Sequence, residues 1–200
     1  MKEFWNERYS ETEYVYGEKP NEYLKEQLLK LPTGKILLPC EGEGRNAIFA
    51  ALNNWKTFAC DFSESGKTKA ESLAEKNGVS FQYDVCDILE YQAAKESFDV
   101  IALIFAHFPE NIRKTIHQKL LTLLKPGGAI ILEGFNKKQL GNSSGGPKSY
   151  EMLFVKEMLI KDFEKCEIEE LEEKTVFLSE GHFHDGEAEL IRGVFRKKFQ

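Results

Sequence analysis

The sequence predicts a doubly wound, three-layer α/β sandwich with a mostly parallel sheet. Short apolar runs alternate with segments that place apolar residues at helical spacing, which is typical of βαβ units and a parallel sheet. A Gly-Glu-Gly turn joins the first apolar run directly to a helical segment. The apolar runs expected to form the parallel strands are 36–38, 57–60, 79–83, 98–105 and 129–132.

The length and composition favour one domain over residues 1–200. A chain of 200 residues with 42% hydrophobic content buries one sizeable core and leaves little room for a second. We divide it into an N-terminal helical lid segment (1–32), a cofactor-binding core (33–135) and a substrate-side region (136–200). The last region contains a turn-rich loop, a helix and a hairpin.

The net charge and the distribution of apolar residues indicate which classes of partner to expect. A formal net charge of -6 provides no basic surface for a phosphate backbone, so we expect no nucleic-acid partner. The first residues are charged and no apolar run reaches membrane-spanning length, which predicts a cytoplasmic protein without a membrane partner. A monomer and a homodimer both fit the sequence.

The N-terminal segment is rich in aromatic residues and should pack on the rest of the protein. Asn21 is placed to cap a helix in which Leu24, Leu28 and Leu31 recur at helical spacing, and Pro32 ends this helix. Because the segment precedes the first strand, it is positioned to lie over a bound cofactor as a lid.

The remaining elements follow from apolar periodicity and turn residues. Helices are expected at 45–52, from the Ser63 cap to Asn77, at 112–124 and at 152–163. The stretches 168–178 and 188–195 predict a terminal hairpin with a wide connection.

Acidic residues follow the second and third strands. Asp61 lies seventeen positions beyond Gly44, where a carboxylate accepts hydrogen bonds from two ribose hydroxyls. Asp87 follows the third strand and suits an exocyclic adenine amine. Together with Gly42 and Gly44, which allow close approach to the main chain, they predict a site for an adenosine-containing cofactor.

The whole arrangement resembles the class I S-adenosylmethionine-dependent methyltransferases. The resemblance rests on the glycine loop, the two acidic strand ends, the Phe98-Asp99 strand and Lys125-Pro-Gly-Gly128 before an apolar strand. It implies a Rossmann-like, seven-stranded sheet closed by an antiparallel C-terminal hairpin, and S-adenosylmethionine as cofactor.

A narrower similarity is to the tellurite-resistance and thiopurine methyltransferase branch. It rests on Trp5-Asn-Glu-Arg-Tyr9, on Tyr16-Gly17 and Pro20-Asn21, and on Gly42-Glu-Gly-Arg-Asn46. It implies that Arg8 contacts the methionine carboxylate. The chain departs from the family pattern at Leu38 and Cys40, where an acidic residue and a glycine are usual.

We therefore expect the cofactor to contact residues from five parts of the chain, while Glu41 is a candidate for a displaced carboxylate near the cofactor amine. The expected cofactor-binding residues are Arg8, Cys40, Glu41, Gly42, Gly44, Asn46, Asp61, Phe62, Ser63, Asp87, Ile88, Phe105 and Ala106.

Methyl transfer chiefly requires alignment of a nucleophile with the activated methyl group. A small-molecule acceptor is expected, and a thiolate, selenide or tellurium species needs no general base. An amine or hydroxyl needs one, for which His107 after the central strand is the candidate.

No metal site is expected. The four cysteines form no C-x-x-C pair and are interpreted as buried, reduced thiols. His182 and His184 stand beside Asp185, but two neighbouring ligands make an incomplete site, so a substrate-contacting loop or plain surface is the interpretation.

Two alternatives stay open. A nicotinamide-dependent oxidoreductase expects G-x-G-x-x-G, whereas Ala47 stands three positions beyond Gly44. A non-catalytic S-adenosylmethionine-binding protein is the other, suggested by Leu38 and Cys40.

Overall fold

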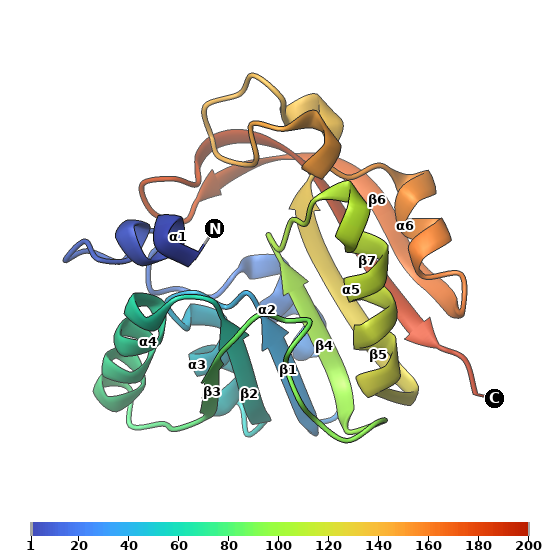
Figure 1. The fold of residues 1–200 in the computed structure, drawn as a ribbon, viewed down its shortest axis with the longest axis horizontal. Helices are drawn as coiled ribbons and strands as arrows, with labels where there is room; N and C mark the ends of the chain where they lie inside the picture. Colours follow the sequence, from blue (N-terminus) through green and yellow to red (C-terminus); the bar gives the residue numbers. More distant parts are fainter. Residues whose placement is uncertain (1, 200) are drawn as a thin grey trace.

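The computed structural model describes residues 2–199 and contains one seven-stranded sheet in the order β3-β2-β1-β4-β5-β7-β6 (Figure 1). The strands are β1 (Lys35–Pro39), β2 (Lys56–Asp61), β3 (Gln82–Val85), β4 (Phe98–Ile104), β5 (Leu124–Phe135), β6 (Cys166–Ser179) and β7 (Asp185–Lys197). The helices are α1 (Lys2–Arg8), α2 (Glu22–Leu28), α3 (Arg45–Leu52), α4 (Glu64–Lys76), α5 (Glu110–Leu123) and α6 (Lys156–Asp162), with short 3-10 turns at Lys137–Gln139 and Tyr150–Met152.

The pairing pattern confirms the predicted fold class. Strand β1 pairs in parallel with β2 and β4, β2 with β3, and β4 with β5. Strand β7 then pairs antiparallel with both β5 and β6, which gives the expected C-terminal hairpin. The order reverses at β1 and β4, and in open α/β sheets ligands bind outside the carboxyl ends of the strands at such a switch point.

Helices cover both faces of the sheet. Leu24 of α2 and Ala47 of α3 pack with Ile36 on one face. Leu120 of α5 and Leu159 of α6 pack with Ile101 on the other. The apolar runs of β1 and β4 are buried on both sides, which is why they lack the alternation of a half-exposed strand.

Several element boundaries differ from the sequence prediction, and three of them have a clear structural reason. The third strand lies at Gln82–Val85 rather than at 79–83, because its partners on β2 are Phe58 to Asp61. The strand expected at 129–132 extends to Leu124–Phe135, since Leu124 already pairs with Phe98 before a register shift. The helix expected from 152 begins at Lys156, because Phe154 forms a bridge with Asn136.

Several segments meet at the carboxyl ends of the parallel strands. In Figure 1, the connection between β6 and β7 reaches over this end of the sheet towards α1. Gly181 packs so closely on the N-terminal segment that an added Cβ would lie 2.5 Å from the Val15 carbonyl oxygen. Within residues 2–199, none of the helices is both long and apolar enough to cross a membrane.

Candidate functional site

The loop between β1 and α3 depends on its glycines. Gly42 and Gly44 have φ angles of 60° and 86°, in the left-handed region that favours glycine. A Cβ on Gly42 would lie 2.5 Å from the Tyr9 hydroxyl oxygen, and one on Gly44 would lie 2.6 Å from the Ala70 Cβ. Cys40 also has a positive φ, of 57°. Both glycines of the predicted loop are therefore required by backbone conformation and by close packing against Tyr9 and Ala70.

Asp61 joins this loop to the end of β2. Its Oδ2 accepts a hydrogen bond from the Gly42 N–H at 3.1 Å, and its Oδ1 accepts one from the Ser63 N–H at 3.0 Å. Burial raises the pKa of Asp61 to about 6, although these backbone hydrogen bonds act to lower it. The structure therefore holds a desolvated carboxylate at the strand end where the sequence predicted a ribose-binding residue.

Glu41 lies against the first turn of α3. Its Oε1 accepts hydrogen bonds from the N–H groups of Asn46 at 2.9 Å and Ala47 at 2.7 Å. Burial raises the pKa of Glu41 to about 7, against the lowering effect of these bonds and of Arg45. The protein's own carboxylate thus occupies the helix N-terminus, a position that binds phosphate groups in many nucleotide-binding proteins.

Asp87 lies near the same loop. Burial raises the pKa of the Cys40 thiol, and the carboxylates of Asp61 and Asp87 raise it further, so both carboxylates surround Cys40. The half-buried Asp87 also accepts a hydrogen bond from the Leu89 N–H at 2.8 Å. The three parallel strand ends therefore bring the predicted acidic residues and the glycine loop together.

The other expected cofactor residues fall into two groups. Phe62 is half-buried, and Phe105 is also half-buried with a φ of 53°. Ile88 and Ala106 instead belong to the hydrophobic core beside α5, and the Asn46 Oδ1 accepts a hydrogen bond from the Asn21 N–H at 2.9 Å. These last three side chains serve packing and the start of α2 in this structure.

The N-terminal segment covers the glycine loop. The rings of Trp5 and Tyr9 stack at 5.5 Å, and the Asn6 Oδ1 accepts a hydrogen bond from the Ser63 hydroxyl at 2.8 Å. Arg8 donates a hydrogen bond to the Tyr16 hydroxyl at 3.1 Å and lies 4.0 Å above the ring of Phe183. The aromatic residues therefore pack as the sequence analysis expected, and the charged group of Arg8 lies among them.

His107 has no free ring nitrogen, which corrects its prediction as a base. Its Nδ1 lies 2.8 Å from the Met152 carbonyl oxygen, and its Nε2 accepts a hydrogen bond from the Phe135 N–H at 3.0 Å. Burial lowers the pKa of His107 to about 4. Because both nitrogens are already engaged with the backbone, this histidine holds three segments together and is not placed to take up a substrate proton.

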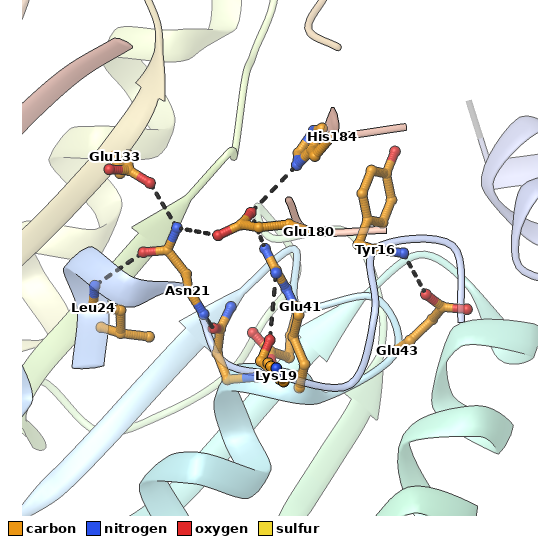
Figure 2. A network of polar contacts seen from close by, with 11 residues as sticks. Tyr16, Lys19, Asn21, Leu24, Glu41, Glu43, Glu133, Glu180 and His184 are labelled. Carbon is orange, nitrogen blue, oxygen red and sulfur yellow. Dashed lines mark hydrogen bonds and ion pairs between the residues drawn. The ribbon is translucent and has the colours of Figure 1, made fainter. Parts of the chain in front are cut away.

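A buried polar network connects the start of α2 with the end of the chain (Figure 2). The Asn21 Nδ2 donates hydrogen bonds to Glu133 Oε1 at 2.6 Å and to Glu180 Oε1 at 3.0 Å. Arg45 donates to Glu180 Oε2 at 2.8 Å, and Glu133 forms an ion pair with Arg192 at 2.5 Å. The sequence analysis identified only the capping role of Asn21. The missed signal was Glu133, a charged residue that directly follows the apolar run 129–132 within β5.

A cavity of about 490 Å³ adjoins this network. It lies between the N-terminal segment 16–23 and the end of β6, and Glu133 and Arg192 contribute to its wall. Gly42, Asp61 and Asp87 do not line it, so this space is distinct from the expected cofactor crevice.

The cysteines and histidines form no metal-binding group of three or more ligands in the part of the chain from 2 to 199. All four cysteines are unpaired, and Cys60 and Cys166 are buried, whereas Cys40 and Cys86 are only half-buried. Of the two hairpin histidines, His182 is exposed and His184 is buried.

The architecture is that of the class I methyltransferase fold. A protein described in work on the conversion of a disulfide bond into a thioacetal group during echinomycin biosynthesis matches with a TM-score of 0.81 at 18% identity, over 99% of this chain and 92% of the other. TehB from Haemophilus influenzae matches with a TM-score of 0.73 at 17% identity, over 98% and 67%. Magnesium protoporphyrin IX methyltransferase from Synechocystis PCC 6803, solved with bound S-adenosylhomocysteine, matches with a TM-score of 0.69 at 13% identity, over 88% and 80%.

Sequence comparison points to the same class. Residues 36–128 match a family model described as a methyltransferase domain. The tRNA N(3)-cytidine methyltransferase METTL2 of Mus musculus is 33% identical over 105 residues, which are 46% of this chain and 26% of that protein. The chain thus spans about a quarter of the length of this relative. The tRNA acceptor printed in its name runs against our expectation that nucleic acid is not a partner.

Proposed function

We propose that this protein is an S-adenosylmethionine-dependent methyltransferase acting on a small-molecule acceptor. The observation that carries the proposal is the hydrogen bond between the Gly42 N–H and Asp61 Oδ2, which places a desolvated carboxylate beside a glycine of the loop. Ribose hydroxyls would satisfy such a carboxylate. The methyltransferase family match over residues 36–128 supports the same conclusion.

The residues around the glycine loop fit S-adenosylmethionine better than they fit a dinucleotide. A dinucleotide places its pyrophosphate at the helix N-terminus after the glycine loop. Here the Glu41 carboxylate already accepts the hydrogen bonds of the Asn46 and Ala47 N–H groups. A pyrophosphate would therefore have to bind next to this carboxylate. A nucleoside without phosphate needs no such position. This argues against the nicotinamide-dependent oxidoreductase.

In the proposed site, Asp61 holds the ribose and Asp87 faces the adenine amine. Gly42 and Gly44 allow close approach of the main chain, and Phe62, Phe105 and the N-terminal aromatic residues exclude water. We assign Arg8 to the methionine carboxylate, because its guanidinium lies over aromatic rings without an ion-pair partner among residues 2–199. Bound there, S-adenosylmethionine supplies an activated methyl group, and the protein's task is alignment and exclusion of water.

The proposal is tested by calorimetric titration with S-adenosylhomocysteine. Saturable binding is expected, and Asp61→Ala should weaken it by about 1–3 kcal/mol because ribose hydroxyls lose their acceptor. Asp84→Ala, on the neighbouring strand β3, is the control and should leave the affinity unchanged. Thermal unfolding of both variants separates lost binding from lost folding. No heat with wild-type protein, or stabilisation by NADH instead, would contradict the proposal.

A nucleic-acid acceptor is the second candidate, favoured by the match to METTL2. The formal net charge of -6 opposes it, since phosphate contacts require clustered lysine and arginine. Methyl transfer from labelled S-adenosylmethionine to unmodified bulk tRNA distinguishes the two. Incorporation into tRNA that falls steeply with salt would favour this second candidate.

A further inference from the structure

Resting on the proposed methyltransferase function, we propose that Nε2 of His184 takes the proton from the acceptor during methyl transfer, with Glu180 as the positioning carboxylate. The acceptor is then a hydroxyl or N–H compound, whose nucleophilic atom carries a proton. A thiolate or selenide anion would have no use for this pair.

The position of His184 is the first argument. Its side chain is 94% buried, since only 6% of the residue is exposed, although it lies in the connection after β6. Its ring centroid lies 4.3 Å from that of Phe105, at the end of β4, and 5.3 Å from that of Phe135, at the end of β5. The ring of Tyr16 lies at 4.6 Å. His184 therefore stands at the carboxyl ends of the central strands, beside a residue expected to contact the cofactor.

Glu180 orients the imidazole. Its Oε2 lies 3.6 Å from the His184 Nδ1, and Figure 2 marks this contact with a dashed line. The separation is outside hydrogen-bond distance, and Nδ1 is buried with no hydrogen-bond partner among residues 2–199. Burial alone would raise the pKa of Glu180, but His184 and Arg45 lower it to about 2, so the carboxylate is ionised at neutral pH. A proton on Nδ1, facing this carboxylate, is the favourable tautomer, and it leaves the Nε2 lone pair free.

Nε2 of His184 has no protein partner in the described part of the chain. It forms no hydrogen bond to any residue between 2 and 199 and, unlike Nδ1, is not among the fully buried atoms that lack a partner. Gly145 packs against this edge of the ring with a φ of 118°, and a Cβ there would lie 2.6 Å from Cδ2 and 3.2 Å from Nε2. A larger residue at position 145 would therefore collide with the ring.

Burial, more than the neighbouring charges, keeps His184 neutral. Burial lowers the pKa of His184, and Arg45 and Arg8 lower it further, whereas Glu180 raises it. The net shift is downward, so the imidazole is uncharged near pH 7 and ready to accept a proton. His107 also packs against the ring of Phe135, but both its nitrogens are engaged with the backbone. It is therefore not an alternative proton acceptor.

The step balances without another reactant. The acceptor's O–H or N–H bond breaks and its proton passes to Nε2, while the nucleophilic atom forms a bond to the methyl carbon. The carbon–sulfur bond breaks, and its electron pair remains on sulfur as the neutral thioether. The imidazolium so formed lies beside the ionised Glu180 and returns its proton to water after product release.

The tautomer of His184 provides a test that needs no acceptor. We expect ¹⁵N NMR of the S-adenosylhomocysteine complex at pH 7.5 to show a neutral ring with the proton on Nδ1, assigned by its absence in His184→Gln. A proton on Nε2, or an imidazolium at this pH, would overturn the proposal. If S-adenosylhomocysteine fails to bind, the proposed function fails instead, and the tautomer is read on the free protein.

Activity supplies the second test. S-adenosylhomocysteine release is measured with phenolic, imidazole and amine acceptors and, separately, with dithiothreitol and selenide. His184→Gln should lower transfer to the proton-bearing acceptor by about 10²–10⁴-fold, with cofactor affinity retained. Glu180→Gln should lower it less and shift the pH profile, and the exposed His182→Gln is the matched control. Full activity of His184→Gln, or turnover confined to thiol and selenide, would overturn the proposal.

Discussion

Arg45, the first residue of α3, and Glu180, the residue after β6, form a buried ion pair in which Nη2 and Oε2 are 2.8 Å apart. Their side chains are 8% and 13% exposed. The pair connects the helix that follows the glycine loop with the C-terminal hairpin, 135 positions further along the chain. The start of α3 and the connection between β6 and β7 are therefore held together by this pair.

Removing one member of this pair should destabilise the protein strongly. Arg45→Met leaves Glu180 buried without its cation, which typically costs about 3–5 kcal/mol of unfolding free energy. Urea unfolding at pH 7 measures the loss. The control is Lys76→Met, which breaks the exposed pair with Glu18 and should leave the midpoint nearly unchanged. Equal effects of the two variants would contradict this account.

Glu41→Gln should make the protein more stable at high pH. The pKa of Glu41 is about 7 in the folded protein, above the usual 4.5, so folding favours the protonated form. The stability that depends on this proton is present below pH 4.5 and is lost as the pH rises through about 7. Glutamine keeps the acceptor oxygen and removes the buried charge.

The expected gain from Glu41→Gln is therefore up to about 3 kcal/mol at pH 8 and vanishes near pH 4.5. Melting temperatures between pH 4.5 and 8 measure it, with the exposed Glu90→Gln as control. Parallel curves for the wild type and Glu41→Gln would show that Glu41 is ionised throughout.

Gly42→Ala should disturb both folding and cofactor binding. The residue has a φ of 60°, and the new Cβ would lie 2.5 Å from the Tyr9 hydroxyl oxygen. Gly78→Ala is a matched control, because its φ is 67° and nothing lies within 4 Å of its Cβ. Gly78→Ala should lose only about 1–2 kcal/mol of unfolding free energy, because its alanine must adopt a left-handed conformation. Gly42→Ala has the same strain and also displaces Tyr9.

Chemical unfolding and S-adenosylhomocysteine titration separate these two contributions. We expect Gly42→Ala to be the less stable variant and the weaker binder. If both variants bind S-adenosylhomocysteine like the wild type, the proposed close approach of the cofactor to Gly42 is wrong.

Asp162→Asn should affect stability without affecting the site. The Asp162 Oδ2 accepts hydrogen bonds from Arg113 Nε at 2.7 Å and lies 2.9 Å from His117 Nδ1. The variant leaves the Arg113 guanidinium buried without its carboxylate, for an expected loss of about 3–5 kcal/mol. Affinity for S-adenosylhomocysteine should not change in the remaining folded protein. A large loss of affinity would mean that α5 and α6 take part in cofactor binding.

Much of the fold could be predicted because it depends on local patterns. Burial produces the apolar runs that form β1 and β4, and it produces the helical spacing of apolar residues in α5. Both patterns can be recognised in the sequence alone. Gly42, Gly44 and Asp61 were found because a turn with positive φ and a carboxylate after a strand both have local signatures. The register of β3 and the true start of β5 depend on a neighbouring strand, which no local pattern describes.

The histidines show the limit of such reasoning. His107 follows the central strand, a position that predicts a base, yet the Met152 carbonyl and the Phe135 N–H, from later in the chain, engage both its nitrogens. His184 lies in a turn-rich connection, where sequence favours a substrate-contacting loop or plain surface. It is buried only because this connection folds back over β4 and β5.

The sequence by itself determined the sheet, the glycine loop and the acidic residues at the strand ends, because these follow from backbone freedom and from burial within single elements. Tertiary structure alone decided which polar groups remain available. His107 uses both ring nitrogens to bond backbone groups 45 and 28 positions away, whereas His184 keeps Nε2 free of hydrogen bonds to residues 2–199. Whether such a side chain is satisfied depends on partners distant in the sequence, and only the folded chain brings those partners within reach.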